Sequence, residues 1–292
     1  MKILIVKLGA AGDVVRTTAL LHALPGEIHW LTSDQNAVLL KGVHNSTTCI
    51  AWSHRDSIRG MRYHLVINLE DTKEAAAFLQ GIGYDELFGS YLTASGQVAY
   101  TQNAREWFDL SLISRYGKEQ ADRLKYENRK TYQELIFSGL GYEFKGQPYF
   151  LPQGEKTDLC GDVAIAPLSG PAWPMKNWDR YDELKNQLES EGFRVNCLPA
   201  RQTLLEHIGD IRNHRCLISG DSLPMHIALG CNVRCVTLFI CTSPWEIYDY
   251  GIQKKIVSPL LHSYFYRRDF DSRAQQSISL SEVLEASLNA FR

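Results

Sequence analysis

Asp13 is the first residue of the chain whose position makes it a candidate for catalysis or ligand binding. It follows an apolar run at residues 3–6 and a turn of small residues, Gly-Ala-Ala-Gly, at residues 9–12. A turn of this kind between a strand and a helix lies at the carboxyl end of a parallel strand, where open α/β sheets bind their ligands. Small residues let a ligand approach the backbone closely, and the free N–H groups of a helix that begins near Val14 suit an anion.

The same turn limits what the ligand is. It has neither the G-x-G-x-x-G spacing of a dinucleotide site nor the G-K-[ST] ending of a P-loop. The sequence therefore favours neither nicotinamide binding nor nucleotide hydrolysis. A purely structural role for Asp13 stays open, because aspartate is a favoured N-cap that stabilises a helix by about 1 kcal/mol.

A second polar turn occurs in the second half of the chain, in CLISGDSLPMHIALG at residues 216–230. Asp221 or Ser222 can cap the helix that follows, and the unpaired N–H groups of its first turn suit a pyrophosphate. His226 falls about one helical turn later, close enough to face the same ligand. A lone histidine in a helix is also commonly a structural residue, so both interpretations are kept.

A long irregular loop at residues 167–178 places Lys176 between Trp173 and Trp178. Long loops at the strand ends of α/β domains are often functional. A fixed cation beside a phosphate site is the simplest use of this lysine. The alternative is a solvated lysine between two core tryptophans.

Alternating strands and helices must position these side chains. In the first half, four segments are predicted to be strands: residues 3–6, 28–31, 49–52 and 64–69. Helical patterns follow the first, second and fourth of them, and residues 104–140 are predicted to be mainly helical. This order is typical of a parallel sheet covered by helices.

A polar stretch with proline and glycine at residues 146–156 separates this half from a second α/β series. The predicted strands of that series are residues 162–166, 194–198, 216–219 and 235–239. Helices are predicted at residues 179–191, from Thr203 and after Asp221. We therefore expect a Rossmann-like domain at residues 1–150, another at 155–275, and a C-terminal helix at 279–292 that begins with a capping box and could pack back on the first domain.

Composition and charge exclude several classes of protein. With 292 residues, 45% of them hydrophobic and 22% charged, the chain can form two ordinary globular cores. Its net charge of −2 gives no general attraction for nucleic acid, although a local basic patch stands at residues 264–268, Tyr-Phe-Tyr-Arg-Arg. Lys7 interrupts the first apolar run too early for a signal peptide, and no stretch approaches the roughly 20 apolar residues of a spanning helix. We expect a cytoplasmic protein with no nucleic-acid partner and at most peripheral membrane contact.

The seven cysteines include no C-x-x-C pair, and their odd number in a chain without an export signal indicates reduced thiols. Cys231, Cys235 and Cys241 form the closest group, but their spacing matches no zinc pattern. We therefore expect buried thiols there and no metal site.

Three regions of the chain together resemble glycosyltransferase family 9, the family of ADP-heptose:lipopolysaccharide heptosyltransferases. They are KILIVKLGAAGDVVRTTALLHALP at residues 2–25, GPAWPMKNW at 170–178, and ISGDSLPMHIALG followed by VTLFICTSPWEIYDYG at 218–230 and 236–251. These blocks occur in the family's order. Residues 30–150 add only the fold-compatible segment YHLVINLED at 63–71.

The resemblance implies an α/β fold of GT-B architecture, in which two Rossmann-like domains face a central cleft. It also implies an inverting glycosyltransferase that needs no metal and no cofactor and takes a sugar nucleotide, most simply ADP-heptose, as donor. In such a reaction the acceptor hydroxyl loses a proton as it attacks the anomeric carbon. Asp13 matches the family's catalytic base, and an aspartate of pKa about 3.9 is ionised at neutral pH.

The resemblance assigns further residues to the donor and the acceptor. Lys176 matches the lysine that contacts the donor phosphates, where it would stabilise the charge of the leaving diphosphate. The donor-binding residues implied beside it are Gly12, Ser169, Trp178, Asp221, Ser222, Leu223, His226, Thr242 and Ser243. Arg16 and Asp71 are expected on the acceptor side.

Two positions depart from the family's pattern. Leu223 stands where the D-[ST]-G motif has glycine, and Ile240-Cys241 replace Gly-Pro ahead of Thr242. A side chain in place of glycine should narrow the donor pocket or shift the backbone near the phosphates. The identity of the donor sugar therefore stays open.

The acceptor and two other functions are open as well. Family members that glycosylate a lipid-linked core often carry basic surface, whereas this chain has a sequence pI of about 6.5. A glycan, a glycolipid, a peptide and a small molecule are all kept as acceptors. The alternative functions are a catalytically silent protein of the same fold that binds sugar nucleotides or glycans, and a nicotinamide oxidoreductase with Asp34 near the ribose position.

Overall fold

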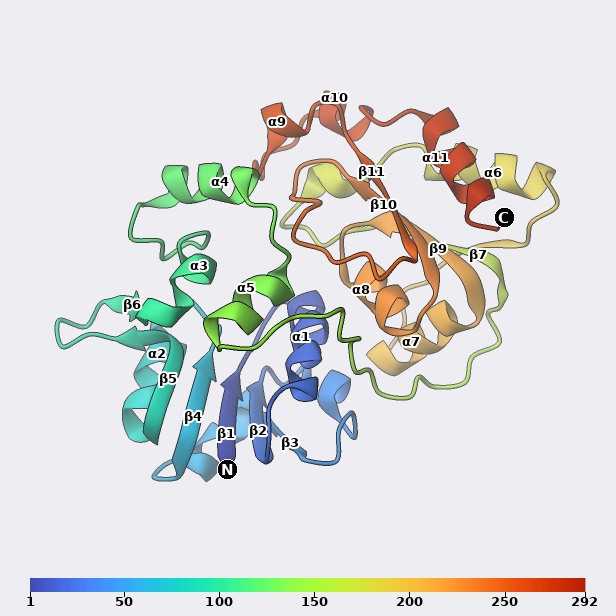
Figure 1. The fold of residues 1–292 in the computed structure, drawn as a ribbon. Helices are drawn as coiled ribbons and strands as arrows, with labels where there is room; N and C mark the ends of the chain where they lie inside the picture. Colours follow the sequence, from blue (N-terminus) through green and yellow to red (C-terminus); the bar gives the residue numbers. More distant parts are fainter. Residues whose placement is uncertain (292) are drawn as a thin grey trace. The chain divides into compact units, whose positions relative to one another are not determined.

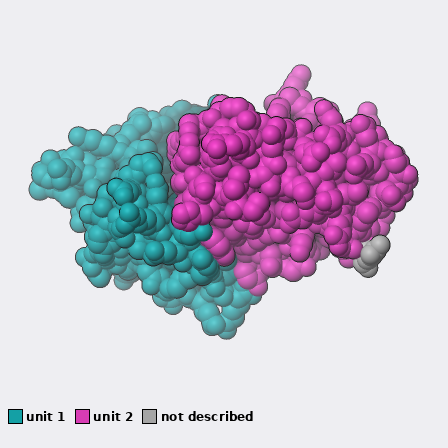
Figure 2. Space-filling view, turned by 90° about the horizontal axis from the view of Figure 1, so that it is seen from above, with its two compact units in different colours: residues 1–152 teal, residues 153–292 magenta. Residues whose placement is uncertain are grey.

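The computed structural model describes residues 1–291. The chain divides between Pro152 and Gln153 into two compact units, coloured separately in Figure 2. We call them unit 1 (residues 1–152) and unit 2 (residues 153–292). The division falls within the polar stretch at residues 146–156.

Unit 1 is built on a six-stranded sheet in the order β3-β2-β1-β4-β5-β6. Its strands are β1 (Lys2–Val6), β2 (Glu27–Thr32), β3 (Thr47–Ala51), β4 (Arg62–Asn68), β5 (Gly83–Leu92) and β6 (Val98–Tyr100). All neighbours run parallel except β5 and β6. The four predicted strands are confirmed as β1 to β4. Ile3, Leu4 and Ile5 of the central strand β1 are fully buried, as expected for a strand covered on both faces.

Helical segments connect these strands or follow the last of them (Figure 1). They are α1 (Ala11–Thr17), α2 (Lys73–Phe78), α3 (Arg105–Phe108), α4 (Lys118–Glu127) and α5 (Tyr132–Gly139), with 3-10 turns η1 (Thr18–His22), η2 (Ala37–Leu40), η3 (Trp52–Ile58), η4 (Leu79–Gly81) and η5 (Gln102–Ala104). The helical region predicted at residues 104–140 is confirmed. The helix predicted after the second strand is only the short turn η2.

The strands β5 and β6 are not among those predicted from the sequence. In β5 only Phe88, Gly89 and Ser90 are buried, so this strand has neither an apolar run nor a regular alternation. All three residues of the edge strand β6 are only partly buried. Neither strand therefore leaves the hydrophobic pattern on which the prediction depends.

Unit 2 is built on a five-stranded parallel sheet in the order β11-β10-β9-β7-β8. Its strands are β7 (Gly161–Ala166), β8 (Val195–Cys197), β9 (His214–Gly220), β10 (Arg234–Phe239) and β11 (Gln253–Val257). Its helical segments are η6 (Pro174–Lys176), α6 (Tyr181–Ser190), α7 (Leu204–Arg212), α8 (Leu223–Gly230), α9 (Leu261–Tyr264), α10 (Ser272–Gln275) and α11 (Leu280–Asn289). Every strand and helix predicted for this half is confirmed, whereas β11, α9 and α10 were not predicted.

The C-terminal helix α11 packs on its own unit. The Ser279 hydroxyl caps it by accepting a hydrogen bond from the Glu282 N–H. Val283 and Ala286 join the core of unit 2, and the helix lies against α6, β10 and β11 (Figure 1). Unit 2 thus covers the apolar face of this helix, and packing of the helix on the first domain stays a prediction.

Within residues 1–291, no helix combines the length and the apolar character needed to cross a bilayer. All seven cysteines are free thiols, and Cys216, Cys235 and Cys241 are buried.

Candidate functional site

Two charged residues of unit 1 meet where β1 and β4 end. The two strands are parallel neighbours, with Val6 opposite Asn68, so the residues that follow them emerge at the same edge of the sheet. There Lys7 Nζ donates a hydrogen bond to Glu70 Oε1 over 3.0 Å. The same oxygen accepts the Leu8 N–H at 2.8 Å. Both charged side chains are largely buried, with exposed fractions of 8% and 10%.

Asp13 lies at this same edge, in the first turn of α1. Its Oδ1 is 2.8 Å from an Arg16 guanidinium nitrogen, and its Oδ2 is 3.7 Å from Lys7 Nζ. The helix begins at Ala11, and its N-cap residue, Ala10, makes no side-chain capping bond. The structure therefore does not support helix capping as the role of Asp13. Its carboxylate lies between two cations and is 32% exposed.

The two cations around Asp13 are held in place by their surroundings. The Arg16 guanidinium lies over the face of the Tyr132 ring, 3.8 Å from its centre. Burial raises the pKa of Tyr132 to about 12, so its hydroxyl stays protonated. Burial also disfavours the charged form of Lys7, but the carboxylates of Asp13 and then Glu70 outweigh that effect and raise the pKa of Lys7 above its ordinary value.

The raised pKa of Lys7 predicts how stability changes at high pH. An unfolded lysine loses its proton near pH 10.4, whereas folded Lys7 keeps it to a higher pH. Above about pH 10.4 the folded state therefore binds more protons than the unfolded state, and the free energy of unfolding falls as the pH rises. The native chain should exceed Lys7→Met in stability by a constant amount from about pH 7 to 10, and this difference should shrink above about pH 10.4.

Urea unfolding of both chains at each pH measures this difference, and all other lysines cancel in the comparison. A difference that stays constant to about pH 11 would show that Lys7 titrates as an ordinary lysine.

The structure also places the other predicted residues of unit 1. Gly12 is the second residue of α1 and immediately precedes Asp13. Asp71 is partly buried and makes no hydrogen bond or ion pair within residues 1–291. Glu70, rather than Asp71, shares the site with Lys7 and Asp13. Lys7 and Glu70 are not among the residues predicted for the site, although each is a charged residue just after a buried strand.

In unit 2, Lys176 and Asp221 form a buried ion pair at the carboxyl edge of the sheet. Lys176 Nζ is 2.7 Å from Asp221 Oδ2 and also donates to the Asp221 backbone carbonyl at 3.0 Å. The Thr242 hydroxyl donates to the same Oδ2 at 2.6 Å. Lys176 is only 7% exposed, so the alternative of a solvated lysine is wrong. Three predicted donor-binding residues from three separate segments therefore meet here.

Gly220, the last residue of β9, lets the loop that carries Lys176 approach closely. A Cβ at this position would lie 3.2 Å from the Lys176 carbonyl oxygen and 3.2 Å from Ser169 Oγ, which is tighter than ordinary packing. Ser169 is itself held by a hydrogen bond from its N–H to Asn177 Oδ1 at 2.6 Å. The predicted residue Ser169 thus lies beside the end of β9, next to the ion pair.

Four polar atoms of residues at or just after the ends of β9 and β10 are buried without a hydrogen-bond partner among the described residues. They are Ser219 Oγ, Asp221 Oδ1, Ser222 Oγ and Ser243 Oγ. Ser222 is the N-cap residue of α8, yet its hydroxyl caps no backbone N–H. Leaving a buried polar group unsatisfied costs about 1–3 kcal/mol, so such groups are normally paired. A ligand with several acceptor oxygens, such as a diphosphate, would pair with the hydroxyls, and a sugar hydroxyl would pair with Asp221 Oδ1.

The remaining predicted residues of unit 2 fall in different surroundings. Leu223 is the first residue of α8 and is partly buried, and His226 lies one turn further on, 6% exposed. Trp178 is 3% exposed, packs in the core and donates its indole N–H to the Ile278 carbonyl at 3.0 Å. The structure therefore places Trp178 in the core rather than at the site, because the core uses both its ring and its N–H.

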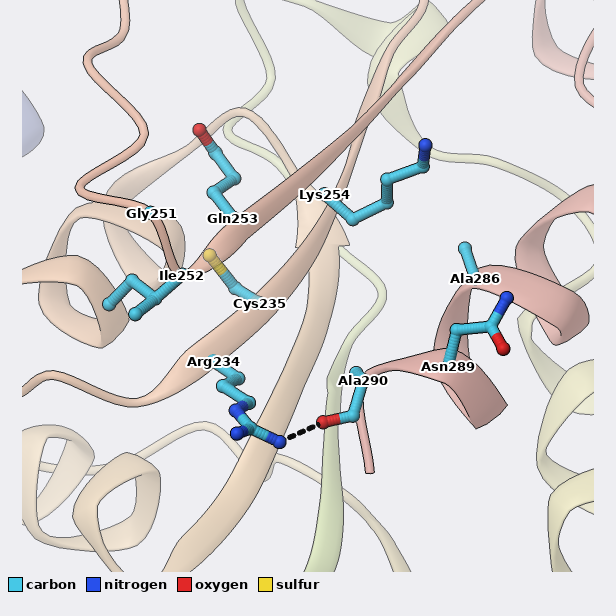
Figure 3. Close-up of a pocket in the computed structure, with 9 residues that line it drawn as sticks. All are labelled: Arg234, Cys235, Gly251, Ile252, Gln253, Lys254, Ala286, Asn289 and Ala290. Atoms are coloured by element: carbon cyan, nitrogen blue, oxygen red, sulfur yellow. Dashed lines mark hydrogen bonds between the residues drawn. The ribbon is translucent and has the colours of Figure 1, made fainter. Parts of the chain in front are cut away.

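A cavity of about 430 Å³ in unit 2 lies elsewhere (Figure 3). Its lining comes from the starts of β10 and β11 and from α11: Arg234, Cys235, Gly251, Ile252, Gln253, Lys254, Ala286, Asn289 and Ala290. None of these is a predicted site residue, and the Arg234 guanidinium already donates to the Ala290 carbonyl at 2.5 Å. The cavity lies at the amino ends of the strands, whereas the ion pair lies at their carboxyl ends.

No group of three His, Cys, Asp or Glu side chains in the described part of the chain could hold a metal ion.

Comparison with known proteins gives structural matches only. No protein-family model and no curated protein sequence matches the chain. The chain is similar over 99% of its length to E. coli heptosyltransferase WaaC with ADP, of which it covers 100%, at 16% identity and a TM-score of 0.65. It is similar over 99% of its length to a family 9 glycosyl transferase from Veillonella parvula, of which it covers 96%, at 16% identity and a TM-score of 0.68. It is also similar over 99% of its length to E. coli ADP-heptose lps heptosyltransferase II, of which it covers 98%, at 18% identity and a TM-score of 0.56.

These matches define the class of fold, which is the GT-B fold of two Rossmann-like units. Within that class, the chain has the fold of the heptosyltransferases of glycosyltransferase family 9. The fold implied by the three sequence blocks is confirmed.

Proposed function

We propose that this protein is a glycosyltransferase that moves a sugar from a nucleoside-diphosphate donor to an acceptor hydroxyl. The observation that carries the proposal is the set of buried, unpartnered hydroxyls beside the Lys176–Asp221 pair at the start of α8. These hydroxyls can donate hydrogen bonds to the oxygens of a diphosphate, and the helix start adds N–H donors. The heptosyltransferase fold supports the same donor class, and ADP-heptose is the first donor to test.

Asp13 is the proposed general base. The acceptor oxygen bonds to the anomeric carbon on the face opposite the diphosphate, and its proton passes to the Asp13 carboxylate. The bond from that carbon to the phosphate oxygen breaks, and its electron pair leaves with the nucleoside diphosphate, so the configuration inverts. A base in reach contributes about 10²- to 10⁴-fold to the rate. Arg16 and Lys7, at 2.8 Å and 3.7 Å, would fix the direction of this carboxylate.

In this proposal, residues of unit 2 stabilise the leaving nucleoside diphosphate. The diphosphate gains negative charge as the glycosidic bond breaks, and preorganised donors stabilise such charge best where water is excluded. Lys176 is buried and the Ser222 hydroxyl is unpartnered, so both are preorganised in this sense. We propose that these two groups and the first N–H groups of α8 take the role that a divalent cation has in metal-dependent transferases.

The nicotinamide oxidoreductase alternative has less support. Asp34, the acid nearest the ribose position, already accepts a hydrogen bond from the Ser53 N–H at 3.2 Å and another from the Ser53 hydroxyl. A silent sugar-nucleotide binder remains a second candidate, because the partly buried Leu223 side chain stands in the first turn of α8, next to the proposed phosphate position. Such a protein would bind nucleoside diphosphates but release none when acceptors are added.

A screen of ligands against thermal unfolding tests the donor class. ADP, ADP-heptose and other nucleoside-diphosphate sugars should raise the midpoint of unfolding, since a ligand at about 100 times its dissociation constant adds roughly 2.7 kcal/mol of stability. NAD should have little effect. Stabilisation by NAD with none by any nucleoside diphosphate would refute the proposal.

A further inference from the structure

The basic patch at residues 264–268 lies beside the proposed donor site. The Arg268 guanidinium carbon is 4.9 Å from the centre of the Trp173 ring, and Lys176 Nζ is 5.3 Å from the centre of the same ring. Trp173 is partly buried, whereas Arg268 is exposed. One aromatic side chain therefore contacts both the buried cation of the donor site and a second cation from a segment nearly a hundred residues further along the chain.

Tyr266 ties this segment to the site. Its N–H donates to the Cys241 carbonyl at 2.8 Å, and its hydroxyl donates to Glu246 Oε1 at 3.3 Å. Its ring also packs edge-on against Trp173, at 5.3 Å between centres and an interplanar angle of 82°. Cys241 immediately precedes Thr242, which donates to Asp221. The position of Arg268 is thus set by contacts with two loops of the donor site.

The charge balance of the site shows what Arg268 adds. Lys176 is neutralised by Asp221 at 2.7 Å, so the buried pair offers a diphosphate no net positive charge. Two other arginines of the same C-terminal segment are also neutralised, Arg267 by Asp269 and Arg273 by Asp271. Arg268 makes no ion pair with any residue in the range 1–291.

We propose that Arg268, held on Trp173, is a second phosphate-binding cation of the donor site, which supplies the net positive charge for a nucleoside diphosphate. This inference rests on the proposed function. A guanidinium suits the task because it binds phosphate oxygens with two parallel hydrogen bonds and also stacks on aromatic rings. A stacking contact at an exposed position is weaker than a charge-assisted hydrogen bond, so a bound diphosphate can draw Arg268 from the ring.

The test compares nucleotide binding by Arg268→Gln and Arg267→Gln in the full chain. Titration calorimetry with ADP, AMP and adenosine gives the three affinities. We expect Arg268→Gln to weaken ADP binding about tenfold, AMP binding less, and adenosine binding by less than about twofold, because the lost contact is to phosphate. Arg267→Gln should change ADP affinity by less than about twofold, since its charge is already paired at the surface.

Two further variants test the role of the aromatic ring and of the guanidinium group. Arg268→Lys keeps the charge but not the planar group, so its ADP affinity should fall between native and Arg268→Gln. In Trp173→Leu the Arg268 side chain is no longer held on the ring. Adding Arg268→Gln to this variant should therefore reduce ADP affinity less than it does in the native chain. Thermal midpoints within a few degrees of native show that the variants fold.

The outcomes separate this inference from the proposed function. If ADP binds and Arg268→Gln weakens it no more than Arg267→Gln does, the second cation is refuted while the donor site stands. Equal losses of ADP and adenosine affinity would also overturn it, because they would place Arg268 away from the phosphates. If no nucleoside diphosphate binds the native chain, both proposals are wrong.

Discussion

Asp13→Asn is expected to abolish sugar transfer while ADP affinity stays within a few fold of native. Asparagine has nearly the same size and keeps an oxygen toward Arg16, but its amide cannot take the acceptor proton. Loss of a general base lowers turnover by about 10²- to 10⁴-fold. Release of ADP from ADP-heptose in the presence of acceptor measures turnover, and calorimetry measures ADP affinity.

The matched control for this variant is Asp85→Asn. Asp85 is an exposed aspartate of β5, paired with Arg62 on the surface of the same unit. The Asp85→Asn substitution should leave both turnover and ADP affinity near their native values. Turnover by Asp13→Asn at a rate similar to this control would remove Asp13 from the mechanism.

Lys176→Ala has the second large expected effect, and it acts on binding, turnover and stability together. The substitution removes the proposed donor to the phosphates and leaves the Asp221 carboxylate buried without its cation. Breaking a buried pair in this way costs about 3–5 kcal/mol of unfolding free energy. ADP affinity should fall at least about tenfold and turnover about 10²-fold or more.

A second variant separates binding from folding. Lys176→Met combined with Asp221→Asn removes both charges at nearly constant volume, so most of the stability should return while ADP binding stays weak. Lys185→Ala is the control, since this lysine forms an exposed pair with Glu189 on α6 of the same unit. ADP affinity at the native value in the double variant would refute the phosphate role of Lys176.

The sequence alone located the parts of the site that follow directly from strand order. Asp221 and Thr242 each come shortly after a buried strand of the unit 2 sheet, and the carboxyl ends of parallel strands share one edge. Asp13 comes in the same way after a buried strand of the separate unit 1 sheet. Lys176 lies in the long loop after β7, the strand next to β9, so its meeting with Asp221 follows from the same rule.

What the sequence did not predict depends on packing between segments far apart. Tyr132, which carries Arg16, lies on α5, so that contact leaves no local pattern. Glu70 does follow a strand next to β1, but its hydrogen bond to Lys7 depends on how the two side chains pack. The sequence also does not distinguish the surroundings of the two tryptophans on either side of Lys176. Trp178 is in the core and Trp173 contacts Lys176, but both come from the same loop, and only the fold of that loop separates them.

A crystal structure of the protein with ADP would show directly whether unit 2 binds the diphosphate. We expect the diphosphate to lie in unit 2 at the start of α8, within hydrogen-bond distance of the Ser222 hydroxyl and Lys176 Nζ. A diphosphate bound instead at the Gly-Ala-Ala-Gly turn of unit 1, with the hydroxyls of Ser222 and Ser243 left untouched, would contradict it.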